Sequence, residues 1–228
     1  MKKQYLISII ILSALVVLGD IVYMLDWKLW EKTFTSVCFA LIGMVGMIYA
    51  IKTKSQFAKY SIYMFVGLTL AMLGDVIINI EFMSGAIIFA MGHVFYFIAY
   101  CHLIPFNWKN LIPSVIVFIP CASLILFVPI FNYGGVLMEI VCLFYALIIS
   151  LMTGKAISMF LTEKSTSNIL IALGSLLFCF SDLMLLFDQF SKAGDIVLYL
   201  CLISYYPAQI LLSYAIFNRC IENESEKQ

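Results

Sequence analysis

The most regular feature of the sequence is a series of long apolar runs separated by short polar clusters. A helix needs roughly 20 mostly apolar residues to cross the hydrocarbon core of a bilayer. Eight runs meet that requirement, at about 5–25, 33–51, 60–80, 82–104, 111–131, 136–160, 168–187 and 194–218. Because the breaks are short, consecutive helices are expected to pack as antiparallel hairpins. The predicted fold is all-α: a polytopic transmembrane bundle of eight helices in one integral membrane domain, 1–228.

The composition excludes several classes of protein. Of the 228 residues, 64% are apolar and 11% are charged, whereas soluble domains are about 45–50% apolar and about 25% charged. These values exclude a soluble globular protein, a disordered chain and a secreted disulfide scaffold. The thirteen basic and thirteen acidic residues balance, so no bulk field favours nucleic acid as a partner. The seven cysteines form no CxxC pair, and we expect them to be free thiols.

The distribution of Lys and Arg predicts the orientation in the membrane. Ten basic residues fall at the termini and in the even-numbered loops, with Lys155 counted in the sixth loop. The other side has three, namely Lys28, Lys32 and Lys192. Both the N-terminus and the C-terminus are therefore expected to be cytoplasmic.

The first apolar run is not expected to be a signal peptide. It follows Lys2 and Lys3, but it continues to Leu25, and no small-x-small cleavage site follows it. We interpret it as a retained helix. No organelle signal is visible, so the expected location is a prokaryotic plasma membrane.

Three acidic residues inside the apolar runs are the most informative polar positions. Asp20, Asp75 and Asp182 each follow a small residue near the end of an odd-numbered run, and a second acid follows six residues later. An ionisable group in the hydrocarbon costs roughly 2.5–3.5 kcal/mol, which favours a functional role. The spacing from Asp75 to Asp182 is nearly twice that from Asp20 to Asp75, which indicates repeated helical hairpins, one without its acid. Alternatively, one or two of these acids only bond to the backbone or to a tyrosine and hold helices together.

The fourth run contains candidate partners for these acids. Helical spacing places His93, Tyr96 and Tyr100 on one face, whereas His102 lies on the opposite face. A zinc site with three histidines cannot form from two histidines on opposite faces. A mixed site of Asp and His is left open, but we expect no metal and no cofactor.

The eighth run contains a second polar group. Tyr205 and Tyr206 precede Pro207, and Gln209 lies one helical turn beyond Tyr205. The proline removes a backbone hydrogen bond near mid-membrane, which is tolerated only against a polar cavity or neighbouring protein. These residues are interpreted either as part of a site or as interhelical hydrogen-bonding groups.

Several motifs occur in a fixed order along the chain. They are Gly67-Leu68 to Gly74-Asp75, then Phe82, Gly85, Phe89 and Gly92-His93-Val94-Phe95-Tyr96, then Gly174, Phe178, Ser181-Asp182-Leu183-Met184-Leu185 and Phe190, and finally Tyr205-Tyr206-Pro207-Ala208-Gln209. In this order and spacing they resemble the YhhN-like lysoplasmalogenase family of eight-helix membrane proteins. The sequence departs from that pattern at Lys32-Thr33, where Lys-Pro is expected, and at Asp20, which rests on the internal repeat alone.

The resemblance implies a hydrolase that cleaves the vinyl ether bond of a lysoplasmalogen to a fatty aldehyde and a glycerophospho-base. A vinyl ether is cleaved by protonation of its β-carbon, which requires an acid beside a group that stays anionic. Two buried carboxyl groups can supply both. We expect Asp75 and Asp182 to form that pair, His93 to tune or transfer the proton, and Asp20 to assist with less support.

The remaining expectations concern substrate and alternatives. Tyr96, Tyr205, Tyr206 and Gln209 are expected to bind the glycerol or phosphate oxygens. The expected partners are a lysophospholipid or another single-chain lipid and the lipids of the membrane, with no nucleic acid; the oligomeric state is left open. The alternatives are a proton-coupled or lipid transporter that uses the intramembrane Asp residues, and a structural membrane protein.

Overall fold

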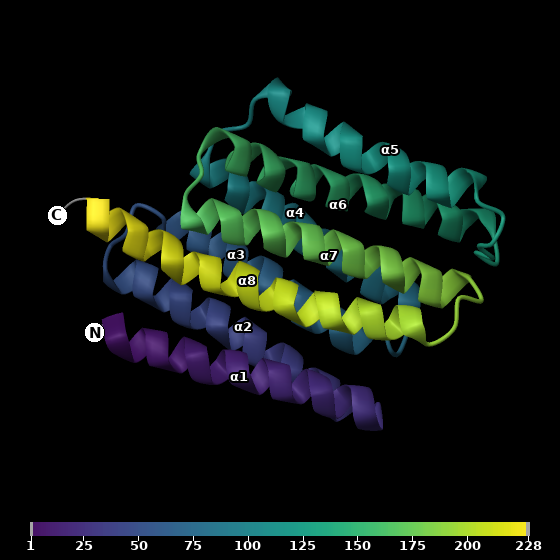
Figure 1. The fold of residues 1–228 in the computed structure, drawn as a ribbon, viewed down its shortest axis with the longest axis horizontal. Helices are drawn as coiled ribbons and strands as arrows, with labels where there is room; N and C mark the ends of the chain where they lie inside the picture. The colour runs from purple at the N-terminus through teal and green to yellow at the C-terminus, as the bar shows by residue number, and fades with distance from the viewer. Residues whose placement is uncertain (1, 227–228) are drawn as a thin grey trace.

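The computed structural model describes residues 2–226, which form eight long helices and one short 3₁₀ helix, with no strand among them. In chain order these elements are α1 (Lys2–Asp26), α2 (Leu29–Lys52), α3 (Ala58–Ile77), α4 (Phe82–Leu103), η1 (Trp108–Asn110), α5 (Leu111–Phe127), α6 (Val136–Thr162), α7 (Thr166–Phe190) and α8 (Ile196–Glu226) (Figure 1). Eight segments, one for each of α1 to α8, are long and apolar enough to cross a membrane. The predicted all-α bundle of eight helices is therefore confirmed.

The helix ends differ from the predicted ends, because hydropathy marks the apolar part of a helix and hydrogen bonds mark its whole length. The second helix begins at Leu29 rather than at Thr33, and the Glu31 carboxylate accepts a hydrogen bond from the Lys28 N–H at that end. The eighth helix continues to Glu226, beyond the predicted end at residue 218. The polar first and last turns thus extend the helices past their apolar spans.

The helices pack as four antiparallel hairpins, α1/α2, α3/α4, α5/α6 and α7/α8. Both ends of the chain lie at the same end of the bundle (Figure 1). We call this the inner end, and the opposite end, where the loop within each hairpin lies, the outer end. The protein is an integral membrane protein by these features, while its cytoplasmic termini and its prokaryotic membrane stay predictions.

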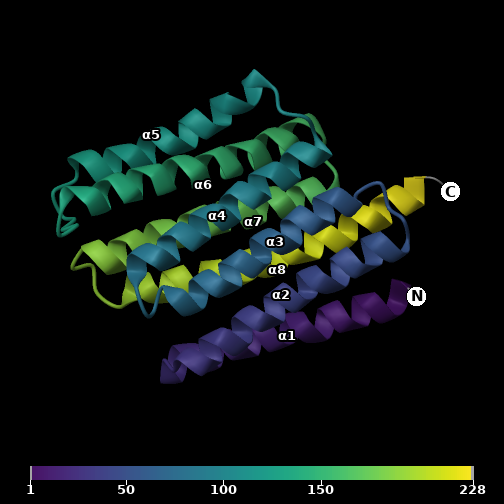
Figure 2. The same cartoon turned by 180° about the vertical axis from the view of Figure 1, so that it is seen from behind.

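Two groups of helices meet along the middle of the bundle. Helix α8 packs on α7, α2, α1 and α3, and α4 packs on α3 and α6. Helices α1 and α5 lie at opposite flanks (Figures 1 and 2). At the centre, the ring centroid of Phe178 lies 5.2 Å from the ring centroid of Tyr205 and 6.4 Å from that of Phe89. These three rings form an aromatic wall between the α2/α3/α8 side and the α4/α6/α7 side.

Two lysines counted as loop charges have oxygen partners inside the bundle instead. Lys155 lies inside α6 and is fully buried, and its Nζ donates hydrogen bonds to Pro105 O at 3.2 Å and Asn110 Oδ1 at 3.0 Å. Lys32 lies in the first turn of α2. Both lysines lie close to oxygen atoms of neighbouring helices or turns. Neither should therefore be counted among the basic loop residues that predict the orientation in the membrane. Without them the remaining basic residues still favour the inner end as cytoplasmic.

The cysteines agree with the sequence. All seven lie within the described residues and are free thiols. Most are partly or fully buried among apolar side chains, where a thiol packs as a small apolar group.

Candidate active site

The carboxyl group of Asp182 is held by one side chain from each of two neighbouring helices. Its Oδ2 accepts a hydrogen bond of 2.6 Å from the Tyr145 hydroxyl on α6. The same oxygen lies 3.1 Å from Nε2 of His93 on α4. We call these three residues the Asp182 cluster. Its members come from α4, α6 and α7, and the side chain of His93 is only 1% exposed.

The hydrogen bonds of this cluster define the tautomer of His93. The single proton of the Tyr145 hydroxyl is donated to Asp182, and Nε2 of His93 lies 2.9 Å from the Tyr145 oxygen. Nε2 therefore carries a hydrogen that it donates to Asp182 and Tyr145. Nδ1 is buried and has no hydrogen-bond partner among the described residues, which makes it the free acceptor nitrogen when the ring is neutral.

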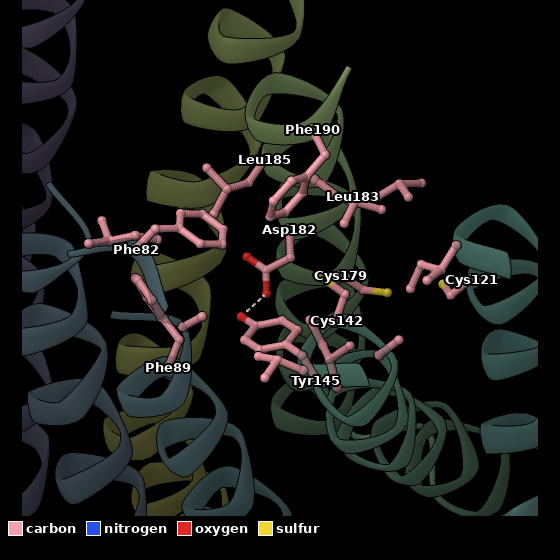
Figure 3. A pocket seen from close by; sticks show the side chains of 17 residues that line it. Phe82, Phe89, Cys121, Cys142, Tyr145, Cys179, Asp182, Leu183, Leu185 and Phe190 are labelled. Carbon is pink, nitrogen blue, oxygen red and sulfur yellow. Dashed lines mark hydrogen bonds between the residues drawn. The ribbon is translucent and has the colours of Figure 1, made fainter. Parts of the chain in front are cut away.

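A pocket with about 70 Å³ of free volume, partly open to the surroundings, lies beside Asp182 (Figure 3). Its walls come from α4, α5, α6 and α7 in the outer half of the bundle, with Phe82 and Phe190 toward the outer end. Three thiols line it, but Asp182 and Tyr145 supply its only side-chain oxygens. In Figure 3 the carboxyl group of Asp182 points into the space between Phe82 and Tyr145. Its Oδ1 has no hydrogen-bond partner among the described residues, so one oxygen is anchored and the other faces the pocket.

Asp75 belongs to a second group on the other side of the aromatic wall. Its Oδ2 accepts hydrogen bonds from the Ser36 hydroxyl at 2.5 Å and the Tyr205 hydroxyl at 2.8 Å. Its Oδ1 lies 3.9 Å from Nζ of Lys32. We call these four residues the Asp75 cluster. Asp75 lies near the C-terminal end of α3, where the side chain of Asn79 also donates to its backbone carbonyl.

The two predicted carboxyl groups thus lie in adjoining clusters and do not form a contacting pair. The charge of Asp182 acts on Asp75, yet no hydrogen bond joins them, and Phe89, Phe178 and Tyr205 lie between the two helix groups. Each carboxyl group has its own donors. Asp182 alone lines the pocket, so the two groups have different access to a ligand.

Asp20 differs from the other two acids. It lies on α1 with 6% of its surface exposed, and its Oδ1 has no hydrogen-bond partner among the described residues. It belongs to neither cluster. The neighbouring Gly19 explains its burial, because a side chain at that position would collide with Thr35 of α2. A catalytic role for Asp20 stays a prediction.

The four predicted substrate-binding residues are buried at the contact between α8 and its neighbours. The Tyr96 hydroxyl donates to Oε1 of Gln209 at 3.2 Å, and Tyr205 donates to Asp75. Tyr206 is 1% exposed. Different residues line the pocket beside Asp182. The Tyr96–Gln209 bond is an interhelical bond of the kind weighed as the alternative, and the binding role of the four residues stays a prediction.

Three residues of the two clusters were not singled out from the sequence. Lys32 was counted as a loop charge, although its spacing from Ser36 places both on one face of a helix. Tyr145 lies in the apolar run of α6, between residues that also line the pocket. Its hydroxyl in an otherwise apolar stretch was the only signal available.

The outer acids, six residues after each inner one, behave as helix-end groups. Asp26 forms an ion pair with Lys28, and Asp188 accepts from its neighbour Gln189. Glu81 caps α4 by accepting hydrogen bonds from the backbone N–H groups of Met83 and Ser84. Hydrogen bonding to Ser84, followed by that to Met83, lowers the pKa of Glu81 below its usual value.

Among the side chains that the structure describes, no group of three or more His, Cys, Asp or Glu could hold a metal ion.

Comparison with known proteins places the two clusters inside a recognised family pattern. The model of the YhhN family matches residues 27–216. This stretch includes every residue of the Asp182 and Asp75 clusters, whereas Asp20 precedes it. No curated protein and no solved structure matches the chain.

Proposed function

The chain belongs to the YhhN family, as its motifs predict, and from this premise we propose that it is a membrane-embedded hydrolase that cleaves the vinyl ether bond of a lysoplasmalogen. The observation that carries the proposal is the carboxyl group of Asp182, with one oxygen anchored by Tyr145 and the other facing an apolar pocket. A single-chain lipid suits such a pocket, because its chain is apolar and its reactive bond adjoins the polar glycerol.

The reaction requires one proton donor and one water molecule. Asp182, protonated on the oxygen that faces the pocket, transfers its proton to the β-carbon of the vinyl ether. The double-bond electrons form the new C–H bond, and the α-carbon and ether oxygen share the positive charge of an oxocarbenium ion. Water then adds to the α-carbon and returns a proton to Asp182. The hemiacetal collapses to a fatty aldehyde and the free hydroxyl of the glycerophospho-base, so the acid is regenerated.

Tyr145 and His93 position this acid. Both donate to Oδ2 of Asp182, so the proton of the neutral carboxyl group occupies Oδ1, on the pocket side. After proton transfer the same two donors stabilise the carboxylate that forms, which favours the transition state over the ground state. Tyr145 and His93 are thus positioning residues in this proposal.

Asp75 contributes from outside the pocket. Hydrogen bonds from Ser36 and Tyr205 and the nearby ammonium group of Lys32 suit an anionic carboxylate. Such an anion acts on Asp182 through space and on the positive charge that develops in the substrate. The two carboxyl groups would divide the roles of acid and anion without sharing a hydrogen bond.

The test is aldehyde release by the purified full-length protein in lipid bilayers. Three substrates are offered: a lysoplasmalogen, its saturated ether analogue and the corresponding ester lysophospholipid. We expect aldehyde from the vinyl ether only, released about 10²–10⁴-fold more slowly by the Asp182→Asn variant. Asp188→Asn is the matched control, because Asp188 lies on the same helix outside the pocket and should leave the rate unchanged.

Two results would contradict the proposal. Near wild-type turnover by folded Asp182→Asn protein would remove Asp182 from the role of acid. A folded wild-type protein that turns over none of the three substrates would remove the hydrolase assignment. In the second case, pH-dependent flux of a lysolipid across sealed vesicles would favour the transporter alternative.

A further inference from the structure

A second hollow adjoins the pocket on the bilayer-facing side of α4 and α6. Its free volume is about 280 Å³, and Tyr145 is the only one of its lining residues that is not purely apolar. Ala90 and Met91 line it from α4, and Phe144 and Ile148 line it from α6. We call this hollow the α4–α6 groove.

The groove faces lipid. Met91 is 48% exposed and Phe144 is 63% exposed. Both lie on helices long and apolar enough to span the membrane, where an exposed apolar side chain contacts lipid chains. The groove is therefore open to the hydrocarbon.

The groove and the pocket share one wall. Ala86, Val141 and Tyr145 line both. The phenol oxygen of Tyr145 donates a hydrogen bond to Asp182, and the same side chain lines both the groove and the pocket. An alkyl chain in the groove would thus contact Tyr145, whose hydroxyl is hydrogen-bonded to the carboxyl group of Asp182.

Small residues create the groove. Ala86 and Ala90 lie one turn apart on α4, and their short side chains leave space opposite Phe144 and Ile148 of α6. From Ala86 the groove extends along α4 to Val94, about 12 Å at 1.5 Å per residue. It leads from the level of the pocket toward the middle of the bilayer, which is the direction of a lipid chain whose head lies at the outer end.

We propose that the α4–α6 groove binds the alkyl chain of a single-chain lipid, with the glycerol end of that lipid in the pocket beside Asp182. The lipid enters sideways from the bilayer, between α4 and α6. This inference deepens the proposed function and rests on it for the reaction, whereas the binding of the chain itself requires no turnover.

The first experiment maps the chain directly. The full-length protein in bilayers is labelled with a saturated alkyl ether lysolipid, a probe without a vinyl ether bond, that carries a photoactivatable diazirine on its chain. We expect adducts on Met91, Val94 and Phe144 that an excess of unlabelled probe suppresses. Ile10 and Ile11 of α1 are similarly exposed, at 59% and 56%, and their labelling should not be suppressed. Equal, unsuppressed labelling at both places would overturn the proposal.

The second experiment fills the groove. Ala90→Phe should reduce the suppressible labelling roughly tenfold, because a phenyl ring displaces at least two buried methylene groups of the chain. Ala14→Phe is the matched control, since Ala14 is exposed on α1. Phe144→Ala tests the same point without added bulk, and it should increase labelling by a probe with a branched chain. Unchanged labelling in both groove variants would count against the proposal.

These measurements separate the inference from the proposed function. Suppressible labelling in the groove without aldehyde release would leave chain binding intact and remove the hydrolase assignment. Aldehyde release without such labelling would leave the hydrolase assignment intact and remove the proposal that the groove binds the alkyl chain.

Discussion

The hydroxyl group of Tyr145 lies 2.6 Å from Oδ2 of Asp182 and donates a hydrogen bond to it. Helix α6 thereby fixes the orientation of a carboxyl group on α7. Without this bond, Nε2 of His93 at 3.1 Å would be the remaining hydrogen-bond partner of the carboxyl group, and the orientation of that group would be less well defined. The orientation of Asp182 is a property of helix packing, and it can be perturbed without removing the acid.

Replacement of the acid itself is the strongest test. Asp182→Asn should lower kcat about 10²–10⁴-fold, the usual contribution of a positioned general acid. The amide keeps the shape of the side chain, so the thermal unfolding temperature in detergent should change little. Asp188→Asn, six residues further along α7 and outside the pocket, should behave as wild type in both measurements. Equal rates for the two variants would contradict the assignment.

Tyr145→Phe tests the positioning. The ring that lines both groove and pocket remains, but Asp182 loses one donor, which should lower kcat about tenfold for a loss of roughly 1.4 kcal/mol. KM should change little, because the groove keeps its shape. Tyr63→Phe is the control: the Tyr63 ring stacks on His102, outside both clusters. When Tyr145→Phe is combined with His93→Gln, the loss of kcat should be smaller than the two single losses added as free energies. Both residues act on Oδ2 of Asp182. Strict additivity would indicate independent roles.

The Asp75 cluster makes a different prediction. Ser36→Ala removes a 2.5 Å hydrogen bond to a buried carboxyl group and should lower the free energy of unfolding by about 2 kcal/mol. Turnover should fall far less than in Asp182→Asn, since Ser36 does not line the pocket. The measurement is reversible denaturation in detergent beside an activity assay. Ser8→Ala is the control, because the Ser8 hydroxyl bonds only to the backbone on the exposed side of α1. A fall in turnover as large as that of Asp182→Asn would instead assign the role of general acid to Asp75.

The apolar pattern predicts the bundle well, for a physical reason. Each spanning helix must satisfy its backbone internally, so long apolar runs leave little choice of structure. The helix ends are less predictable, as the early start of α2 at Leu29 illustrates. There the capping hydrogen bonds of Glu31 decide the boundary, and hydropathy does not register them.

The site is predictable only in part. Asp75, His93 and Asp182 are visible in the sequence because ionisable groups are rare in apolar runs. Tyr145 and Lys32 are not, because a phenol is common in such runs and a lysine at a helix start resembles a loop charge. The spacing of Asp75 and Asp182 along the chain also says nothing of the aromatic wall between them, which forms only when α4, α7 and α8 pack together.

The cap of α4 predicts a pH dependence. Hydrogen bonds to Ser84 and Met83 hold the pKa of Glu81 below its usual value of 4.5. Because the folded-state pKa is lowered, this cap stabilises the fold above pH 4.5, and its contribution is lost as the pH falls through the lower folded value. The difference in unfolding free energy between wild type and Glu81→Gln should be constant at neutral pH and shrink in acid. Ser84→Ala, which removes the side-chain hydrogen bond of Ser84 to Glu81, the largest cause of the shift, should move that loss to higher pH. A difference that persists unchanged in acid would contradict this account.

Close packing of α5 on α6 depends on one glycine. A Cβ at Gly154 would lie 2.3 Å from the backbone nitrogen of Ser114, and a backbone cannot yield as a flexible side chain can. Gly154→Ala should therefore lower the free energy of unfolding by about 1–3 kcal/mol, the usual cost of overpacking. The pocket should also widen, because α5 forms one of its walls, and the KM for a short-chain lysolipid should rise. Gly135→Ala is the matched control, since a side chain there meets open space. If both variants were equally stable, α5 would be free to move away from α6, and the pocket would not depend on that contact.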